Sequence, residues 1–266
     1  MTSEELAKRI RFHAIKMVNH AHASHIGGIL SCADIVAVLY SEIARIYPHD
    51  PENESRDRII LSKGHNGVAI YAALAECGFF NKELLKTYGD NGSCFSCHIS
   101  HRHVPGVEIS TGSLGQGVGV ACGMALNGKL KHRSYQVYAI VGDGECNEGA
   151  IWEMASFASH QCLDNFTVIV DRNRMQAMGW CEDVLKMEPF QEKWRAFGWH
   201  VVNVIDGNNH KELKRAFSQK SNNNKPRVII ANTVKGKGIS FMENQLLWHY
   251  RDPQGEDYFN ALKELE

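Results

Sequence analysis

Residues 136–175 read QVYAIVGDGECNEGAIWEMASFASHQCLDNFTVIVDRNRM. Two short apolar runs, 137–141 and 166–170, flank a helix-compatible segment at 150–160. This order of strand, turn, helix and strand is typical of a right-handed crossover between two parallel strands. Both strands then end at the same edge of a sheet, so the polar residues that follow them are brought together.

Asp143 follows the first of these strands and Asn173 follows the second. Open α/β sheets bind ligands at the carboxyl ends of their strands. A carboxylate and an amide oxygen suit a hard divalent cation that also holds phosphate oxygens. Taken singly, Asp143 could cap the next helix and Asn173 could be a turn residue. Together they favour a metal-bridged diphosphate site.

Length and composition indicate one large α/β domain. The 266 residues include 29 basic and 30 acidic side chains with no long run of either sign, which gives no support for binding to nucleic acid or an anionic membrane. No apolar stretch approaches membrane-spanning length, and no signal peptide is recognisable. Eight scattered cysteines without an export signal are typical of reduced thiols. We therefore expect a cytoplasmic protein with no nucleic-acid or membrane partner.

The other segments predict a doubly wound α/β fold, with a mostly parallel sheet of about five strands and helices on both faces. Thr2 begins a capping box for the first helix, and Ser31 begins another for a helix over 33–46. Residues 81–110 look irregular, and only a tail follows residue 250. We expect a single domain over 1–266. The further expected elements are strands at 58–61, 199–205 and 228–231, helices ending near 77 and 130, and a helix over 211–219.

A glycine-rich run, Gly112 to Gly119, precedes the helix that ends near residue 130. Its spacing is not that of a dinucleotide fingerprint, and it precedes rather than follows the best strand. Glycines here let the backbone approach a ligand and leave amides free at a helix start. Close helix packing on the glycines is an equally good interpretation.

The motif Cys94-Phe95-Ser96-Cys97-His98 matches the c-type haem attachment pattern, and with His101 and His103 it is similar to a zinc cluster. Haem attachment requires export, for which the sequence has no signal. We therefore expect neither haem nor zinc at these residues.

Several histidines indicate a catalytic site instead. They lie in glycine-rich or polar breaks, and loops at strand ends carry function more often than regular elements do. The histidines are His25, His65, His98, His103 and His249.

With these residues in hand, the chain resembles the N-terminal, diphosphate-binding part of transketolase, as found in split, two-subunit forms. Each motif is weak alone, but their order and spacing are specific and extend over nearly the whole chain. The motifs are Leu61-Ser62-Lys63-Gly64-His65, Gly106-Val107-Glu108, Ser110-Thr111-Gly112-Ser113-Leu114-Gly115-Gln116-Gly117, Gly142-Asp143-Gly144-Glu145, Glu148-Gly149, Asp171-Arg172-Asn173, Asp206-Gly207, Lys225-Pro226, Thr233-Val234-Lys235-Gly236-Lys237-Gly238 and Trp248-His249.

The resemblance implies thiamine diphosphate held through Mg²⁺ or Ca²⁺. Asp143, the Asn173 side chain and the Met175 carbonyl would ligate the metal, and two diphosphate oxygens and a water would complete an octahedron. The positions that would contact the cofactor are His65, Gly112, Leu114, Gly142, Asp143, Gly144, Glu145, Asn173 and His249.

The resemblance also implies transfer of a two-carbon ketol unit from a ketose or ketose phosphate donor to an aldose acceptor, with the carbanion chemistry supplied by the cofactor. Glu148 matches an acidic residue near the subunit interface that is thought to couple paired sites. The positions that would handle the donor or move protons are His25, His65, His98, His103 and His249.

In this family the glutamate that activates the cofactor lies in a pyrimidine-binding domain, which does not fit after residue 250. We therefore expect a separate C-terminal partner subunit, in an α2β2 assembly. Other interpretations are a deoxyxylulose phosphate synthase-like subunit, the α subunit of a 2-oxoacid dehydrogenase, or a non-catalytic cofactor-binding or regulatory homologue. The Lys63-Gly64-His65, Leu114-Gly115-Gln116-Gly117 and Trp248-His249 motifs favour transketolase.

Three departures from the family pattern lie near where the donor would enter. Cys97-His98-Ile99 replaces the usual glycine-histidine-proline, and His101-Arg102-His103 is richer in imidazole and positive charge. Tyr250-Arg251 replaces the small residue that usually follows the last histidine. We therefore expect a donor or acceptor other than ordinary pentose phosphates, such as a modified or sulfonated sugar or a secondary-metabolite intermediate.

Overall fold

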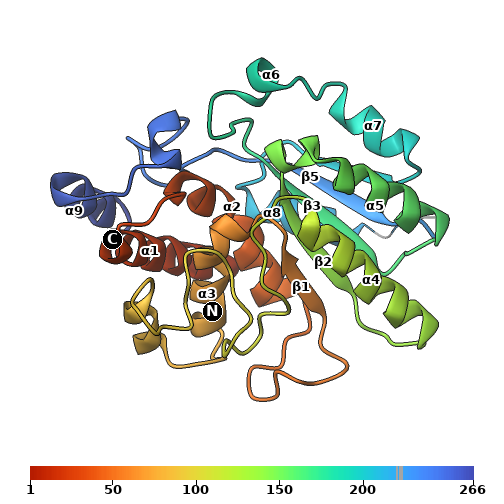
Figure 1. Cartoon of the computed structure of the whole chain (residues 1–266), viewed down its shortest axis with the longest axis horizontal. Coiled ribbons are helices and arrows are strands. Elements are labelled where there is room, and N and C mark those ends of the chain that lie inside the picture. The colour runs from red at the N-terminus through yellow and green to blue at the C-terminus, as the bar shows by residue number, and fades with distance from the viewer. Residues whose placement is uncertain (220, 222–223) are drawn as a thin grey trace.

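The computed structural model describes residues 1–219, 221 and 224–266. Within them, five parallel strands form one sheet in the order β1-β2-β3-β5-β4 (Figure 1). The predicted doubly wound α/β fold is confirmed. The strands are β1 (Arg58–Leu61), β2 (Val137–Gly142), β3 (Phe166–Arg172), β4 (His200–Val204) and β5 (Arg227–Asn232).

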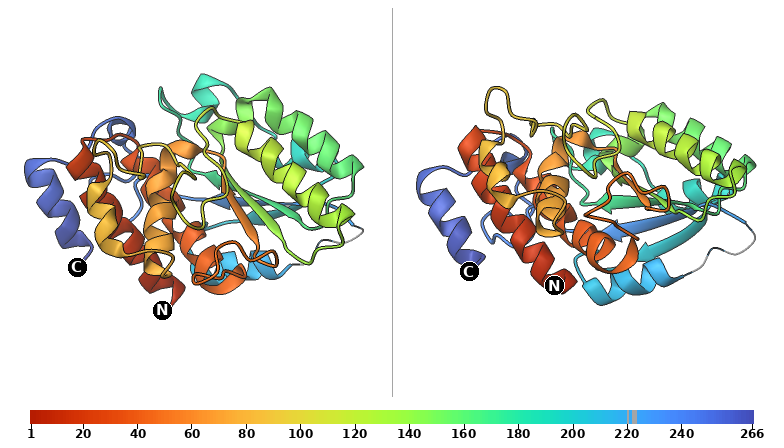
Figure 2. Two further views of the ribbon diagram at one scale, coloured as in Figure 1. Left: turned by 60° about the horizontal axis from the view of Figure 1, so that its bottom comes forward. Right: turned by 90° about the horizontal axis from the view of Figure 1, so that it is seen from below.

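Helices cover both faces of the sheet, with a hydrophobic core under each layer (Figures 1 and 2). One layer contains α1 (Ser3–Ala21), α2 (Ile26–Val38), α3 (Gly67–Glu76) and α8 (His210–Ser218). The opposite layer contains α4 (Gln116–Leu130), α5 (Gly149–His160) and α7 (Phe190–Ala196). The remaining elements are η1 (Leu39–Ile43), η2 (Gly64–Asn66), η3 (Lys82–Thr87), η4 (Gly144–Asn147), α6 (Cys181–Val184), η5 (Leu246–His249) and α9 (Gly255–Glu264).

The crossover predicted from residues 136–175 is present. β2 and β3 pair in parallel, with Gly142 opposite Asp171, and α5 connects them. The backbone N–H of Asp143 continues the pairing by donating to the Asp171 carbonyl at 3.3 Å. The two strand ends therefore lie side by side, as the sequence pattern required.

The start of the second helix differs from the prediction. Thr2 caps α1 as expected and accepts from the Glu5 N–H at 3.2 Å, but α2 begins at Ile26, with His25 at its N-cap in a left-handed conformation. Ser31 lies inside the helix and donates to the Asp171 carboxylate at 2.5 Å. The residues of the expected capping box have tertiary partners, so they do not mark a helix end.

The same helical region corrects the expectation that no apolar stretch approaches membrane-spanning length. Ile26–Ile43 is 18 residues long with a mean hydropathy of 1.6, and 83% of that window is buried inside the fold. It packs against α1, α3 and α8, which is how the core helix of a layered α/β protein satisfies its apolar surface.

The C-terminal segment, which was expected to be only a tail, contains a helix. Residues after 250 form α9, which packs against α1 (Figure 1). Its apolar residues, including Ala261 and Leu265, join the core cluster on that side of the molecule.

Gly64 lets a loop from residues 99–111 lie against η2. The Gly64 carbonyl accepts from the Ile99 N–H at 2.9 Å, and the Ile99 carbonyl accepts from the Thr111 N–H at 3.2 Å. A Cβ at Gly64 would stand 2.1 Å from the Thr111 carbonyl oxygen. This contact is with backbone, so a side chain cannot be accommodated by a change of rotamer.

We expect Gly64→Ala to lower the free energy of unfolding by about 1–3 kcal/mol, the usual cost of overpacking. The matched control is Gly119→Ala, an exposed position in α4 where a Cβ would meet nothing within 4 Å. That change should be neutral or stabilise the chain by about 0.5–1 kcal/mol through helix propensity. Urea unfolding of the two variants measures both effects, and equal stability of the two would contradict the steric argument.

Candidate functional site

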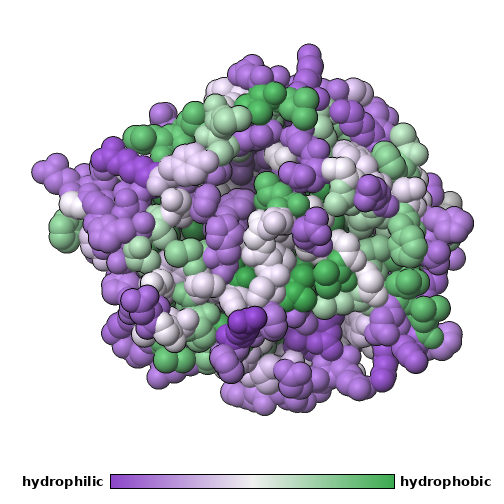
Figure 3. Space-filling view, viewed as in Figure 1, coloured by the Kyte–Doolittle hydropathy of each residue, from purple (hydrophilic) through white to green (hydrophobic). Residues whose placement is uncertain are grey.

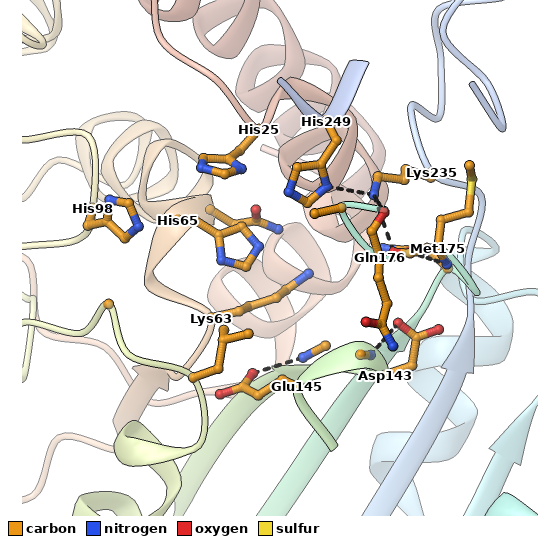
Figure 4. A pocket seen from close by; sticks show the side chains of 18 residues that line it. His25, Lys63, His65, His98, Asp143, Glu145, Met175, Gln176, Lys235 and His249 are labelled. Atoms are coloured by element: carbon orange, nitrogen blue, oxygen red, sulfur yellow. Dashed lines mark hydrogen bonds between the residues drawn. The ribbon is translucent and has the colours of Figure 1, made fainter. Parts of the chain in front are cut away.

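A cavity of about 260 Å³ lies at the carboxyl edge of the sheet. Figure 4 shows His98, His65 and His25 on one side of it and Asp143 and Met175 on the other, with His249 next to Lys235 between them. All of the site residues expected from the sequence line this cavity except His103 and Glu148. The expected residues that line it are His25, His65, His98, Gly112, Leu114, Gly142, Asp143, Gly144, Glu145, Asn173, Met175 and His249.

Asp143 is held in place by backbone donors. Its carboxylate accepts from the Gly144 N–H at 2.9 Å and from the Arg174 N–H at 2.6 Å. Burial, and then the nearby Asp171 carboxylate, raise the pKa of Asp143 to about 6. A buried carboxylate with a raised pKa is destabilised in its charged form, and a bound cation removes that penalty. The position therefore fits a metal ligand.

Asn173 and Met175 present further oxygens on the same side. The Asn173 Oδ1 accepts from the Met175 N–H at 3.1 Å, and its Nδ2 lies 3.3 Å from Asp171 and 3.3 Å from Ser31. These bonds fix the amide so that its oxygen faces away from the Asp171 carboxylate. Carboxylate, amide and carbonyl oxygens are the donor set that Mg²⁺ and Ca²⁺ prefer.

Four imidazoles gather at the opposite end. The ring centroid of His25 lies 4.9 Å from that of His65, 5.0 Å from that of His249 and 5.9 Å from that of His98. Burial lowers the pKa of His25 to about 4, that of His65 to about 2 and that of His249 to about 3. Those three rings are therefore neutral near pH 7. The buried Nδ1 of His25 has no hydrogen-bond partner among the described residues.

Glu145 lines the cavity, and its carboxylate accepts three hydrogen bonds from the protein. It accepts from the Gly115 N–H at 2.9 Å, from the Gly142 N–H at 3.0 Å and from the Ser62 hydroxyl. These bonds tie the glycine-rich run to the ends of β1 and β2. The geometry supports a positioning role for Glu145.

Glycines of the glycine-rich run serve both purposes that the sequence left open, which are close helix packing and close approach of the backbone to a ligand. A Cβ at Gly117 would lie 2.7 Å from the Ser62 Cα, so this glycine serves close packing. Gly112 lines the cavity, and a Cβ there would meet only the His98 ring, at 3.6 Å, within 4 Å. Gly112 therefore leaves space at the cavity wall.

His103 and Glu148 lie outside the cavity. His103 is exposed, in a left-handed turn that precedes the buried Val104. Because Val104 points inward as the loop's anchor, the turn carries His103 outward, and the structure does not bring it to the other histidines. Glu148 is exposed at the start of α5, and its stem lies against Gly115.

The cysteines of the Cys94–Cys97 motif are free, and Cys97 is exposed. His101 accepts from the Ser110 N–H at 3.1 Å, which fastens the loop to itself. Within residues 1–219, 221 and 224–266, no group of three or more His, Cys, Asp or Glu side chains is arranged to hold a metal ion.

Comparison with known proteins gives the family. Residues 2–265 match the family described as "Transketolase, thiamine diphosphate binding domain". This chain belongs to that family.

Subunits of transketolases are among the most similar relatives. The chain is 43% identical over 261 residues to the 6-deoxy-6-sulfo-D-fructose transketolase subunit SqwG of Clostridium sp., covering 98% of this chain and 94% of that protein. It is 40% identical over 265 residues to an apulose-4-phosphate transketolase subunit of Phocaeicola vulgatus, covering 99% and 94%. Both relatives therefore have nearly the same extent as this chain.

The fold is also that of larger transketolases. The crystal structure of Campylobacter jejuni transketolase has a TM-score of 0.92 and 31% identity to this chain, and covers 99% of it. This chain spans 42% of that protein. It therefore corresponds to the thiamine diphosphate-binding domain of a transketolase and to less than half of the longer proteins.

The transketolase cavity also contains two lysines that the sequence interpretation did not assign to the site. Lys63 donates to the buried Asp171 carboxylate, and Lys235 lies between the Met175 carbonyl and His249. Burial lowers the pKa of Lys235 to about 8. Lys63 and Lys235 follow the ends of β1 and β5, so the strand-end rule that found Asp143 could have found them too.

We expect Asp143→Ala to abolish metal-dependent binding of thiamine diphosphate, with at least a hundredfold loss of affinity, since even outer-shell changes cost about 10- to 100-fold. Isothermal calorimetry with Mg²⁺ measures the loss, and circular dichroism should show that the fold is retained. Asp183→Ala, an exposed carboxylate in α6, is the control. Normal binding by the Asp143 variant would show that this side chain is not the metal ligand.

Proposed function

We propose that this chain binds thiamine diphosphate through a divalent cation and, with a partner subunit, transfers a two-carbon ketol unit from a ketose donor to an aldose acceptor. The observation that carries the proposal is the placement of Asp143, Asn173 and Met175 at one end of a cavity whose other end holds a histidine cluster. One end suits a metal-bound diphosphate and the other suits a polyhydroxy donor.

The cation, Mg²⁺ or Ca²⁺, would take one oxygen each from the Asp143 carboxylate, the Asn173 amide and the Met175 carbonyl. Each of these oxygens also accepts an N–H in the structure. An oxygen of this kind has two lone pairs, so it can accept a hydrogen bond and bind a cation together. His65, His249 and Gly144 line the cavity and match the positions that would contact the diphosphate.

The histidines would orient the donor. Thiamine diphosphate, when bound, supplies the carbon nucleophile and the electron sink. His25 and His65 are held neutral by burial, so each can donate one hydrogen bond and accept another. Together with His98 they can bind the donor's hydroxyl and carbonyl oxygens and move its hydroxyl proton.

The partner would be a C-terminal subunit with a pyrimidine-binding domain, in an α2β2 assembly. Two of the most similar relatives are named as transketolase subunits, which supports a divided enzyme. Glu148 is exposed beside the glycine-rich run, where it could reach a second subunit. Figure 3 shows hydrophobic residues interspersed with polar ones on the viewed face. A cytoplasmic location remains a prediction.

We expect the chain alone, with thiamine diphosphate and Mg²⁺, to show no ketol transfer. Mixing it with the product of a neighbouring reading frame that encodes a pyrimidine-binding domain should restore turnover. The partner supplies the group that activates the cofactor, so activity should saturate with partner concentration. A coupled assay for the released aldose measures turnover. Comparable turnover by the chain alone would show that the partner subunit is not required.

The donor is proposed to be a modified sugar. Tyr250 follows His249 where the family usually has a small residue, and it is 64% exposed. Its ring centroid lies 4.8 Å from that of His249 and 6.2 Å from that of His25. The ring therefore stands beside the histidines, next to but not among the residues that line the cavity. The names of two relatives refer to apulose 4-phosphate and to 6-deoxy-6-sulfo-D-fructose, which supports a donor outside the common pentose phosphates.

We expect the complex to prefer such a modified ketose over xylulose 5-phosphate. Tyr250→Gly should change the ratio of kcat/KM for the two donors by about tenfold or more in favour of xylulose 5-phosphate. Small changes in the shape of a binding pocket typically alter substrate discrimination by that factor. Tyr250→Phe retains the ring and should retain the preference. Equal activity of the unmodified complex on both donors would exclude this specificity.

A further inference from the structure

The ammonium group of Lys235 has three acceptors and no acidic partner among them. Its Nζ lies 3.2 Å from the Met175 carbonyl oxygen, 3.3 Å from the Gln176 carbonyl oxygen and 2.9 Å from the Nδ1 of His249. A lysine ammonium has three N–H donors and no acceptor. The three contacts use all of them, which fixes the direction of each bond (Figure 4).

This arrangement determines which ring nitrogen of His249 carries the proton. The ammonium form of Lys235 can only donate, so the Nδ1 of His249 must be bare when Lys235 is protonated. An imidazolium is excluded for the same reason, since it would point an N–H at the ammonium across 2.9 Å. The proton of the neutral ring is therefore on Nε2.

The position of His249 is fixed independently of its ring. Its carbonyl accepts from the His25 N–H at 2.7 Å, and the two ring centroids stand 5.0 Å apart. Lys235 is buried and reaches the site from the segment after β5, with its stem against Gly27. Lys235 is thus held by its buried stem, and His249 is held by a backbone hydrogen bond.

We propose that Lys235 is a positioning residue that holds His249 as a fixed Nε2–H donor for an oxygen of the bound diphosphate. The diphosphate oxygens only accept hydrogen bonds. A ring protonated on Nδ1 would present a lone pair to them and would repel the anion, whereas Nε2–H attracts it. The lysine therefore decides whether His249 helps or opposes binding, in addition to its own charge. The use of this donor rests on the proposed function, but the tautomer itself does not.

The test is ¹⁵N NMR of the full chain with labelled histidine, in which protonated and bare ring nitrogens give separate signals. Loss of signals in His249→Gln assigns the ring. We expect the unmodified chain at pH 7 to favour the Nε2–H form by roughly tenfold or more, as a charge-assisted hydrogen bond should ensure. If the unmodified chain shows mostly the Nδ1–H form of His249, or an even mixture of the two forms, the proposal is wrong.

Lys235→Met keeps an unbranched stem and removes the donors, so the preference should fall to a mixture of tautomers. Lys237→Met is the matched control, because Lys237 is two residues away, pairs with Glu243 at 3.2 Å and does not touch His249 in the described structure. It removes the same charge and should leave the His249 signals unchanged. An unchanged tautomer in the Lys235 variant, or an equal change in both variants, would overturn the proposal.

Titration of thiamine diphosphate and Mg²⁺ into the complex with its partner separates this inference from the proposed function. Binding should move the His249 Nε2 signal in the unmodified chain. If the cofactor binds and the signal does not move, the assignment of His249 as a diphosphate donor is wrong. If the cofactor does not bind at all, the proposed function fails while the tautomer result stands.

Discussion

The buried carboxylate of Asp171 joins the parts of the chain that make the site. It accepts from Lys63 after β1, from Ser31 in α2, from Asn173 after β3 and from Thr233 after β5. Its exposed fraction is zero. An unpaired charge in such a place would cost several kcal/mol, so the donors and the carboxylate hold one another in a single arrangement. The distances between cavity residues depend on this one group.

That arrangement also explains the electrostatics of the cavity. Asp143 and Asp171 are two buried carboxylates close enough to raise the pKa of Asp143. Lys63 neutralises one of them, and Asp143 remains without a side-chain cation of its own among the described contacts. At the other end, burial keeps three imidazoles neutral. The fold therefore presents oxygens that favour a cation and neutral imidazoles that can form hydrogen bonds within one cavity, with the ammonium group of Lys235 between them.

Most of the fold and much of the cavity could be predicted because they follow from local patterns. Apolar runs mark the strands, and parallel pairing then places Asp143 beside Asn173. Two predictions were wrong because contacts between residues far apart in the sequence decide where a side chain lies. Ser31 resembles a cap but binds Asp171, and His103 resembles its neighbours but is turned outward by the burial of Val104. No pattern within a few residues reports such long-range contacts.

The long apolar helix formed by Ile26–Ile43 has a consequence for how such a site can diversify. It forms an inner wall that is buried over 83% of its length, and substitutions there would disturb the core. Cys97 and Tyr250, by contrast, are exposed and lie next to cavity histidines in the chain. Substitution can therefore be restricted in this buried helix while exposed positions beside the cavity vary. Exposed side chains there can be exchanged with little loss of stability, since surface substitutions usually change the free energy of unfolding by about 0.5 kcal/mol or less.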